Sequence, residues 1–311
     1  MTITNYLTVA DLLGSWRDDV LSGTPPILYP MGIGELERIE IGPGRVLLLG
    51  GAPGAGKSAF TMQAVVDALR LTPTLRALVC NVEMTPAVLM DRQLARLSGI
   101  DLNTIRLRTL GVEHGERIDA ALQTLEPLAE RLCFVRAPFD LANVAASADA
   151  FNAGLIVLDY IQRIKPPGNH SGDKRGSVDA TMDFLRQFAD AGVAVIVVAA
   201  VSRSKDTKGR STYDGDALSL ASFRESSELE FGADDAFILV NDPNDEAGVI
   251  LRHLKARHTE AKDIALAFDR PRQRFEPRTV APTPAAGKLL STLAGLWDRA
   301  AAADDGSAGD P

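Results

Sequence analysis

One stretch, LLLGGAPGAGKSAF at residues 47–60, constrains the fold of this chain more than any other. Within it, residues 51–58 match the pattern G-x-x-x-x-G-K-[ST], with a row of leucines before the pattern and an apolar, helix-like run after it. This pattern forms a glycine-rich turn between a buried strand and a helix, where backbone N–H groups and the helix dipole attract an anion. The stretch therefore predicts an α/β domain that binds the phosphates of a nucleotide at the end of a strand.

The residues of this loop have separate expected roles. Lys57 reaches the β- and γ-phosphates, and the Ser58 hydroxyl ligates Mg²⁺, while the backbone of the glycine-rich turn holds the phosphates. The sequence thus predicts ATP and Mg²⁺ as cofactors. The candidate nucleotide-binding residues of the loop are Gly51, Gly54, Ala55, Gly56, Lys57, Ser58 and Ala59.

Strand-like and helix-like patterns alternate along the rest of the chain. Most of the apolar runs are continuous, as expected for strands buried on both faces of a parallel sheet. The predicted strands are RVLLLG at 45–50, ALVCNVE at 77–83, LCFVR at 132–136, AGLIVLDYI at 153–161, VAVIVVAAV at 193–201 and DAFILV at 235–240. Residues 248–258 and 263–277 instead read as antiparallel strands added at one edge. The predicted fold is a P-loop NTPase with a mostly parallel sheet, helices on both faces and an antiparallel edge extension.

Two acidic residues are candidates for the chemistry. Asp159 follows the apolar run GLIVL, as a Mg²⁺-side aspartate at the end of a buried strand would. Tyr160 rather than a glutamate comes next, so the base that activates water must lie elsewhere. Glu83 ends the strand after the P-loop helix, at the sheet edge where ligands of such folds bind, and is the candidate base. The alternatives are an ordinary strand-end cap for Asp159 and a solvated carboxylate for Glu83.

Composition limits the possible partners. The net charge of −8 argues against a surface that binds nucleic acid all over, so any such contact must come from a local patch. The N-terminus lacks a basic region followed by an apolar core, and no apolar run approaches the roughly 18 residues of a membrane span. These features predict a cytoplasmic protein with no membrane contact.

The sequence divides into three parts. Residues 24–277 are the predicted ATPase domain, and residues 278–311 are a predicted flexible tail rich in Ala, Pro, Gly and Asp. In residues 1–23, helical spacing predicts one amphipathic helix, which covers either its own core or a neighbouring subunit. Its apolar stripe comprises Val9, Leu12, Leu13, Trp16 and Val20.

Several segments together resemble the RecA-like motor domain of the DnaB family of replicative helicases. The resemblance spans roughly residues 24–277, in the order of that family. Besides the P-loop, it rests on NVEM at 81–84, LIVLDYIQ at 155–162, FRESSELEFGADD at 223–235, LKARH at 254–258 and LAFDRPRQRFE at 266–276. With about 23 residues before the core, we expect the N-terminal primase-interacting domain of that family to be absent.

The resemblance implies a hexameric ring with ATP bound between subunits. Lys255 and Arg257 match the family segment that reaches into the neighbour's site, where an arginine finger stabilises the charge on the transferring phosphoryl group. Arg92 matches a family position near the base of the nucleotide. Gln162 matches a family glutamine just beyond the Mg²⁺-side aspartate. An alternative for Arg92 is an ordinary helix-surface arginine. The Ser-Gln pair that the family carries on its sensor strand is absent or shortened here, which leaves Ser202 and Arg203 as the nearest polar residues.

Two polar, glycine-rich loops are candidates for contact with DNA. They span residues 163–177 and 203–216, and in a ring several such cationic loops would track a single-strand backbone. The alternative is a pair of solvated surface loops. The candidate nucleic-acid residues are Lys165, Lys174, Arg175, Lys205, Lys208 and Arg210.

Two functions fit these residues best. The first is an ATP-hydrolysing, ring-forming DNA helicase or translocase of DnaB type, which acts in DNA replication on single-stranded DNA and with other replication proteins. The second is a RecA-like ATPase whose nucleotide state switches an assembly without unwinding DNA. A small-molecule kinase fits less well, because Lys255 and Arg257 on an edge hairpin suit a subunit interface better than a substrate lid.

Overall fold

The computed structural model describes most of the chain. A compact unit extends to Pro277 and contains every described helix and strand, while residues 278–311 form a second unit of which only Arg278 is described. The described residues are 6–167, 174–201, 204–205, 211–212, 218–223, 228–242 and 245–278.

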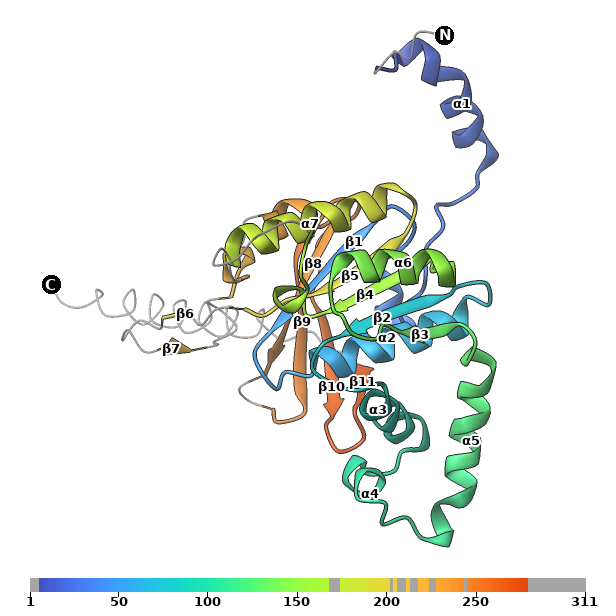
Figure 1. The fold of residues 1–311 in the computed structure, drawn as a ribbon, viewed down its shortest axis with the longest axis vertical. Coiled ribbons are helices and arrows are strands. Elements are labelled where there is room, and N and C mark those ends of the chain that lie inside the picture. Colours follow the sequence, from blue (N-terminus) through green and yellow to red (C-terminus); the bar gives the residue numbers. More distant parts are fainter. Residues whose placement is uncertain are drawn as a thin grey trace, which may run out of the picture. The chain divides into compact units, whose positions relative to one another are not determined.

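A nine-stranded sheet forms the centre of the first unit, in the order β11-β10-β9-β8-β1-β5-β4-β2-β3 (Figure 1). The six strands from β8 to β3 run parallel to one another, whereas β9, β10 and β11 continue the sheet in antiparallel fashion. The strands are β1 Val46–Gly51, β2 Ala77–Asn81, β3 Leu132–Phe134, β4 Leu155–Asp159, β5 Ala194–Val198, β8 Asp235–Asn241, β9 Gly248–Ala256, β10 Ile264–Asp269 and β11 Arg274–Pro277. A separate two-stranded sheet pairs β6 Ser204–Lys205 with β7 Ser211–Thr212. The predicted parallel sheet and its antiparallel extension are confirmed.

Helices cover both faces of the sheet, and the alternation of side chains along β1 shows why. Leu47 and Leu49 pack into one apolar cluster with α2, whereas Val46 and Leu48 pack into another with α6, α7 and α8 (Figure 1). Because both faces are buried, the central strands read as continuous apolar runs. The α-helices of the sheet-containing core are α2 Lys57–Leu71, α3 Pro86–Ser98, α4 Leu102–Arg106, α5 Gly115–Leu125, α6 Leu141–Phe151, α7 Lys174–Asp190 and α8 Glu228–Gly232. Short 3-10 helices are η1 Gly34–Arg38, η2 Val112–His114, η3 Glu126–Leu128, η4 Ile161–Arg163 and η6 Leu220–Ser222.

The helix expected near the N-terminus is α1, Val9–Ser22. Thr8 and Asp11 form a capping box at its start, and Gly23 ends it in the left-handed conformation. None of its side chains is buried, so Leu13 and Trp16 stay about half exposed, at 51% and 56%. The helix is therefore well capped, but nothing in the described chain covers its apolar stripe. Among the described residues, no helix combines the length and the apolarity that crossing a bilayer requires.

The antiparallel extension braces the P-loop. The rings of Phe268 in β10 and Phe275 in β11 stack with centroids 4.1 Å apart, and Phe60 of α2 meets Phe275 edge-on. A Cβ at Gly56, whose φ is +93°, would lie only 2.7 Å from the Phe275 ring. The side-chain amide of Gln63 bonds both the backbone N–H and the carbonyl of Phe275. The predicted phosphate-binding loop thus packs against a wall of stacked aromatic rings.

Candidate nucleotide-binding site

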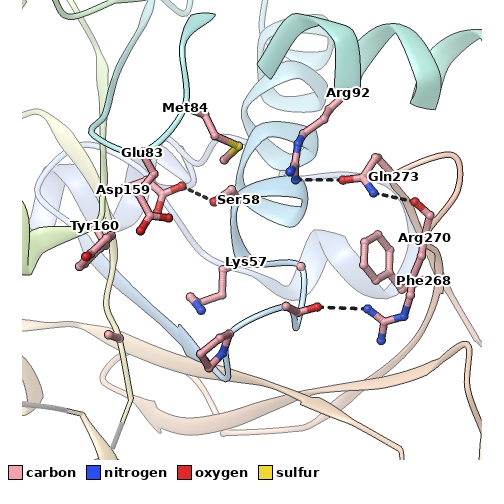
Figure 2. Close-up of a pocket in the computed structure, with 14 residues that line it drawn as sticks. Lys57, Ser58, Glu83, Met84, Arg92, Asp159, Tyr160, Phe268, Arg270 and Gln273 are labelled. Carbon is pink, nitrogen blue, oxygen red and sulfur yellow. Dashed lines mark hydrogen bonds between the residues drawn. The ribbon is translucent and has the colours of Figure 1, made fainter. Parts of the chain in front are cut away.

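The P-loop lies at the carboxyl end of β1 and leads directly into α2. It opens onto a cavity of about 550 Å³ that Lys57, Ser58, Glu83, Arg92 and Asp159 all line (Figure 2). These residues come from α2, from α3 and from the ends of β2 and β4, which lie at the same edge because the strands are parallel. The structure therefore brings together the P-loop, the two acidic candidates Asp159 and Glu83, and Arg92, which was predicted to lie near the nucleotide base.

Lys57 rests on its own loop. Its Nζ donates hydrogen bonds to the carbonyl oxygens of Gly51 at 2.8 Å and Ala52 at 3.1 Å. Burial lowers the pKa of the lysine, and the nearby carboxylates of Asp159 and Glu83 oppose this shift. A triphosphate in the cavity would offer the ammonium group stronger acceptors than these two carbonyls.

Asp159 is the last residue of β4 and is only 5% exposed. Its Oδ2 accepts a hydrogen bond of 2.5 Å from the Ser58 hydroxyl and one of 2.8 Å from the side-chain amide of Asn81. Burial raises the pKa of Asp159, the Ser58 bond opposes that shift, and Glu83 adds to it. A hydroxyl and a buried carboxylate in contact are the hard oxygen ligands that Mg²⁺ takes beside substrate phosphates, so Ser58 and Asp159 fit this cation.

Glu83 lies in the turn after β2 and is exposed toward the same cavity (Figure 2). Its backbone N–H donates to the Asn81 side-chain oxygen at 3.0 Å. Within the described residues, its carboxylate has no hydrogen-bond partner. An unengaged carboxylate at the rim of a phosphate site is available to accept a proton from water.

The β10–β11 hairpin closes another side of the cavity with Phe268, Arg270 and Gln273, which the sequence motifs did not single out. Arg92 of α3 donates to the Gln273 side-chain oxygen at 3.0 Å, and Gln273 donates to the Arg270 carbonyl at 2.6 Å. The Arg270 guanidinium lies 4.9 Å from the centre of the Phe268 ring and bonds the Gly54 carbonyl at 3.1 Å. Phe268, Arg270 and Gln273 fall within the segment LAFDRPRQRFE, which carried the family resemblance, but that resemblance assigned them no role. Burial lowers the pKa of Arg92.

Gln162 lies in η4, just beyond β4. Its side-chain amide exchanges two hydrogen bonds with the backbone of Ala200, at 3.2 and 3.4 Å. Ala200 itself lines the nucleotide cavity. The contact of Gln162 with nucleotide stays a prediction.

Lys255 and Arg257 are not part of this cavity. They lie at the end of β9, where Ala256 pairs with Asp235 at the start of β8, and Asp235 pairs in turn with Leu47. The P-loop follows the opposite end of β1, so about five strand residues, or roughly 16 Å, separate the two locations. The chain therefore presents its two predicted trans-acting cations at the amino ends of the strands, away from its own P-loop.

At that edge, Arg257 is held by a buried acidic residue. Arg257 donates to Asp234 at 2.7 Å and to the Phe231 carbonyl at 3.2 Å. Asp234 is 2% exposed and also accepts bonds from Arg186 at 2.7 Å and from the Val46 backbone at 2.8 Å. A carboxylate with three donors from three elements therefore holds the Arg257 guanidinium itself in place.

The Lys255 ammonium group is held at the same edge. It donates to the carbonyl of Ala233 at 2.8 Å and to that of Phe231 at 3.3 Å. Both candidate trans-acting side chains are therefore hydrogen-bonded to the segment just before β8.

The candidate DNA loops are described only in part. Lys165 is exposed shortly after η4, and Lys174 and Arg175 begin α7. Lys205 belongs to β6. The remaining predicted contacts, Lys208 and Arg210, lie outside the described residues, as do Ser202 and Arg203 of the predicted sensor segment.

Fold and site together define a RecA-like P-loop nucleotide-binding domain. Residues 30–277, most of the chain, match the family model of the DnaB-like helicase C-terminal domain, and the chain belongs to that family. This confirms the resemblance carried by the sequence motifs.

Known proteins agree with this assignment. The replicative DNA helicase DnaB of Buchnera aphidicola subsp. Baizongia pistaciae is 23% identical over 232 residues, which are 72% of this chain and 46% of that protein. The chain thus spans about half the length of the curated relative it matches.

Solved structures share the fold. One is a DnaB-like replicative helicase, described with its interactions with primase; it has a TM-score of 0.74 and 18% identity over 86% of this chain and 68% of that chain. Another is an ATPase domain with a TM-score of 0.75 and 18% identity, over 88% of this chain and all of that chain. At this identity the likeness concerns the fold.

Proposed function

We propose that this protein hydrolyses ATP as the motor of a head-to-tail ring that moves along single-stranded DNA, as a DnaB-type helicase or translocase in replication. The observation that carries the proposal is the separation of Lys255 and Arg257 from their own P-loop. A surface that presents the finger at one edge and the nucleotide at the other makes a heterologous contact, and such contacts form a ring when the rotation between successive subunits closes. Family membership supports a hexamer.

Within one such shared site, the residues divide the work. Lys57 binds the β- and γ-phosphates, and Ser58 and Asp159 hold Mg²⁺. Mg²⁺, when bound, neutralises charge on the phosphates. Glu83 orients a water molecule and takes its proton, and Arg257 of the neighbouring subunit stabilises the charge that develops on the transferring phosphoryl group.

The uncovered stripe on α1 supports the ring as well. A capped amphipathic helix with no buried side chain needs a partner, and a neighbouring subunit supplies one in a head-to-tail assembly. Because the chain spans about half of its curated relative, replication partners of the longer protein stay proposals here.

DNA contact is proposed for the loops that follow β4 and β5. Lys165 is exposed in the first loop, and a ring would repeat each such charge around a central channel. We place this activity in the cytoplasm, where replicating DNA would be its substrate.

A second candidate is an ATPase that switches an assembly without moving on DNA, and the net charge of −8 favours it. ATPase rates with and without single-stranded DNA separate the two. The motor requires stimulation by DNA, whereas the switch predicts none.

The ring is tested by the mass of the protein in solution, with and without a non-hydrolysable ATP analogue. We expect a multiple of the chain mass of 33.2 kDa with the analogue. A protein that stays monomeric under both conditions would leave Arg257 with no site to reach, and the proposal would be wrong.

A further inference from the structure

Asn81 links two parts of the candidate nucleotide site, the Asp159 carboxylate and the Glu83 turn, which belong to separate sequence motifs. It is the last residue of β2 and is 7% exposed. Its Nδ2 donates to Asp159 Oδ2 at 2.8 Å, across 78 positions of sequence. Its Oδ1 accepts the backbone N–H groups of Glu83 at 3.0 Å and Met84 at 2.8 Å.

This arrangement determines the orientation of the amide. The amide oxygen faces two N–H donors, and the amide nitrogen faces a carboxylate. In a flipped amide, the NH₂ group would face the two N–H donors and the oxygen would face the carboxylate, so neither end could form a hydrogen bond. An aspartate at position 81 would lack the donor, and an alanine would lack both functions. Among side chains of this length, the amide of asparagine alone donates to Asp159 and accepts from the Glu83 turn at once.

The two bonds matter because of what lies at each end. Asp159 Oδ2 receives both Ser58 and Asn81, which orients the carboxylate on the Mg²⁺ side. The Glu83 carboxylate has no hydrogen bond of its own among the described residues, so its place depends on its backbone. That backbone is held at the Glu83 and Met84 amides by Asn81.

We propose that Asn81 is a positioning residue for ATP hydrolysis, which sets the Glu83 turn against the Asp159 carboxylate. The inference rests on the proposed function, in which Glu83 activates water and Asp159 holds Mg²⁺. Asn81 touches neither nucleotide nor water in this role; it acts through the two carboxylates. A displacement of about 1 Å in such a group is enough to slow a reaction by about 100-fold.

The test uses the full chain with Asn81→Ala and Asn81→Ser. For Asn81→Ala we expect kcat to fall by about 10- to 100-fold, while KM for ATP changes by less than about twofold. Amide hydrogen exchange, which does not depend on activity, should accelerate in the segment 82–85, because the Glu83 and Met84 amides lose their acceptor. Nucleotide binding without Mg²⁺ should match that of the unchanged protein.

Asn81→Ser separates the two bonds. A serine hydroxyl accepts from a backbone N–H two residues on, but it is too short to replace the amide bond to Asp159. We therefore expect slow exchange at Glu83 to return and kcat to recover only in part, to a value above that of Asn81→Ala but still several-fold, up to about tenfold, below the original.

Asn143→Ala is the matched control. The Asn143 amide also holds a loop at this edge of the sheet, through the carbonyls of Arg136 and Pro138 at 2.7 Å each, but that loop does not line the P-loop cavity. This variant should exchange faster near residues 136–143 and keep its kcat.

Three results would overturn the inference. They are an unchanged kcat in Asn81→Ala, a reduced kcat with unchanged exchange in 82–85, and a full kcat in Asn81→Ser. If Asn81→Ala loses exchange protection throughout the chain, that variant is unfolded, and the inference is then tested with Asn81→Ser alone. Glu83→Gln is measured beside them. If it hydrolyses ATP as fast as the unchanged protein, the part of the proposed function that makes Glu83 the base fails. If Glu83→Gln is slow and the Asn81 variants are not, only the role of Asn81 is refuted.

Discussion

The charged residues at the two edges of the central sheet differ in how far they are paired within the chain. At the carboxyl edge, Glu83 is unpaired within the described chain, and Lys57 is bonded only to carbonyls of its own loop. At the amino edge, Arg257 is bonded to Asp234, which is itself tied to Arg186 and to β1.

This difference indicates that the carboxyl edge is arranged to bind a ligand, whereas the amino edge holds its charged side chains in fixed positions. Catalysis by fixed charges needs groups that do not reorganise during the reaction. The amino edge meets this condition within one chain, whereas the carboxyl edge does so only when phosphates and Mg²⁺ compensate its charges. In the proposed ring, each subunit would supply one edge of a shared site.

The largest expected effect is that of Lys57→Ala. Loss of the ammonium group should weaken ATP binding by about 100-fold and leave hydrolysis undetectable, because a charged hydrogen bond to the phosphates disappears. Titration with a fluorescent ATP analogue measures the binding. Lys262→Ala, at an exposed lysine paired with Glu260, is the control and should bind normally. Full affinity in Lys57→Ala would mean that the cavity is not the phosphate site.

Arg257→Ala tests the amino edge. We expect kcat of the assembled protein to fall by about 1,000-fold with little change in nucleotide affinity, as for other arginine fingers. Steady-state ATPase assays above the assembly concentration measure this, and Arg108→Ala, at an exposed arginine paired with Asp91, should leave the rate unchanged. An unaltered rate in assembled Arg257→Ala would remove the residue from the site.

A mixture of Lys57→Ala and Arg257→Ala proteins tests the comparison between the edges directly. In an equal mixture, about one interface in four combines an intact P-loop with an intact finger, so about a quarter of the activity should return if contacts are head-to-tail. Activity that stays at zero after subunit exchange would place both residues in the same subunit's site.

Glu83→Gln should have a smaller effect. The amide keeps the shape of the side chain but accepts no proton, so kcat should fall by about 100-fold while ATP binding persists. Single-turnover hydrolysis together with equilibrium binding measures the two separately. Glu113→Gln, at a well-exposed glutamate, is the matched control. A Glu83→Gln protein that hydrolyses ATP normally would move the base elsewhere.

The smallest expected effect is that of Asp234→Asn on stability. The loss of the buried charge weakens its bonds to two partly exposed arginines, so the free energy of unfolding should drop by about 2 kcal/mol. Urea denaturation measures this. Asp190→Asn removes the other, exposed partner of Arg186 and should change the free energy far less. Equal losses in both variants would show that the amino edge is no more rigid than the surface.

Much of the site was predictable from local pattern. The P-loop, Asp159 and Glu83 each follow an apolar run, and parallel strands bring their carboxyl ends to one edge. Asn81, Arg270 and Gln273 were missed because their roles depend on partners distant in sequence. The bond from Arg92 to Gln273 spans 181 positions, and no local spacing encodes it.

By itself, the sequence determined the fold class, the candidate nucleotide-binding loop and the family. Continuous apolar runs require a sheet buried on both faces, and the glycine pattern requires a turn that exposes N–H groups. Only the tertiary structure decided which charges share a cavity and which lie apart. Strand direction decides this: the antiparallel return of β9 carries Arg257 back to the amino edge, and a linear chain does not reveal on which edge a residue ends until its strand is paired.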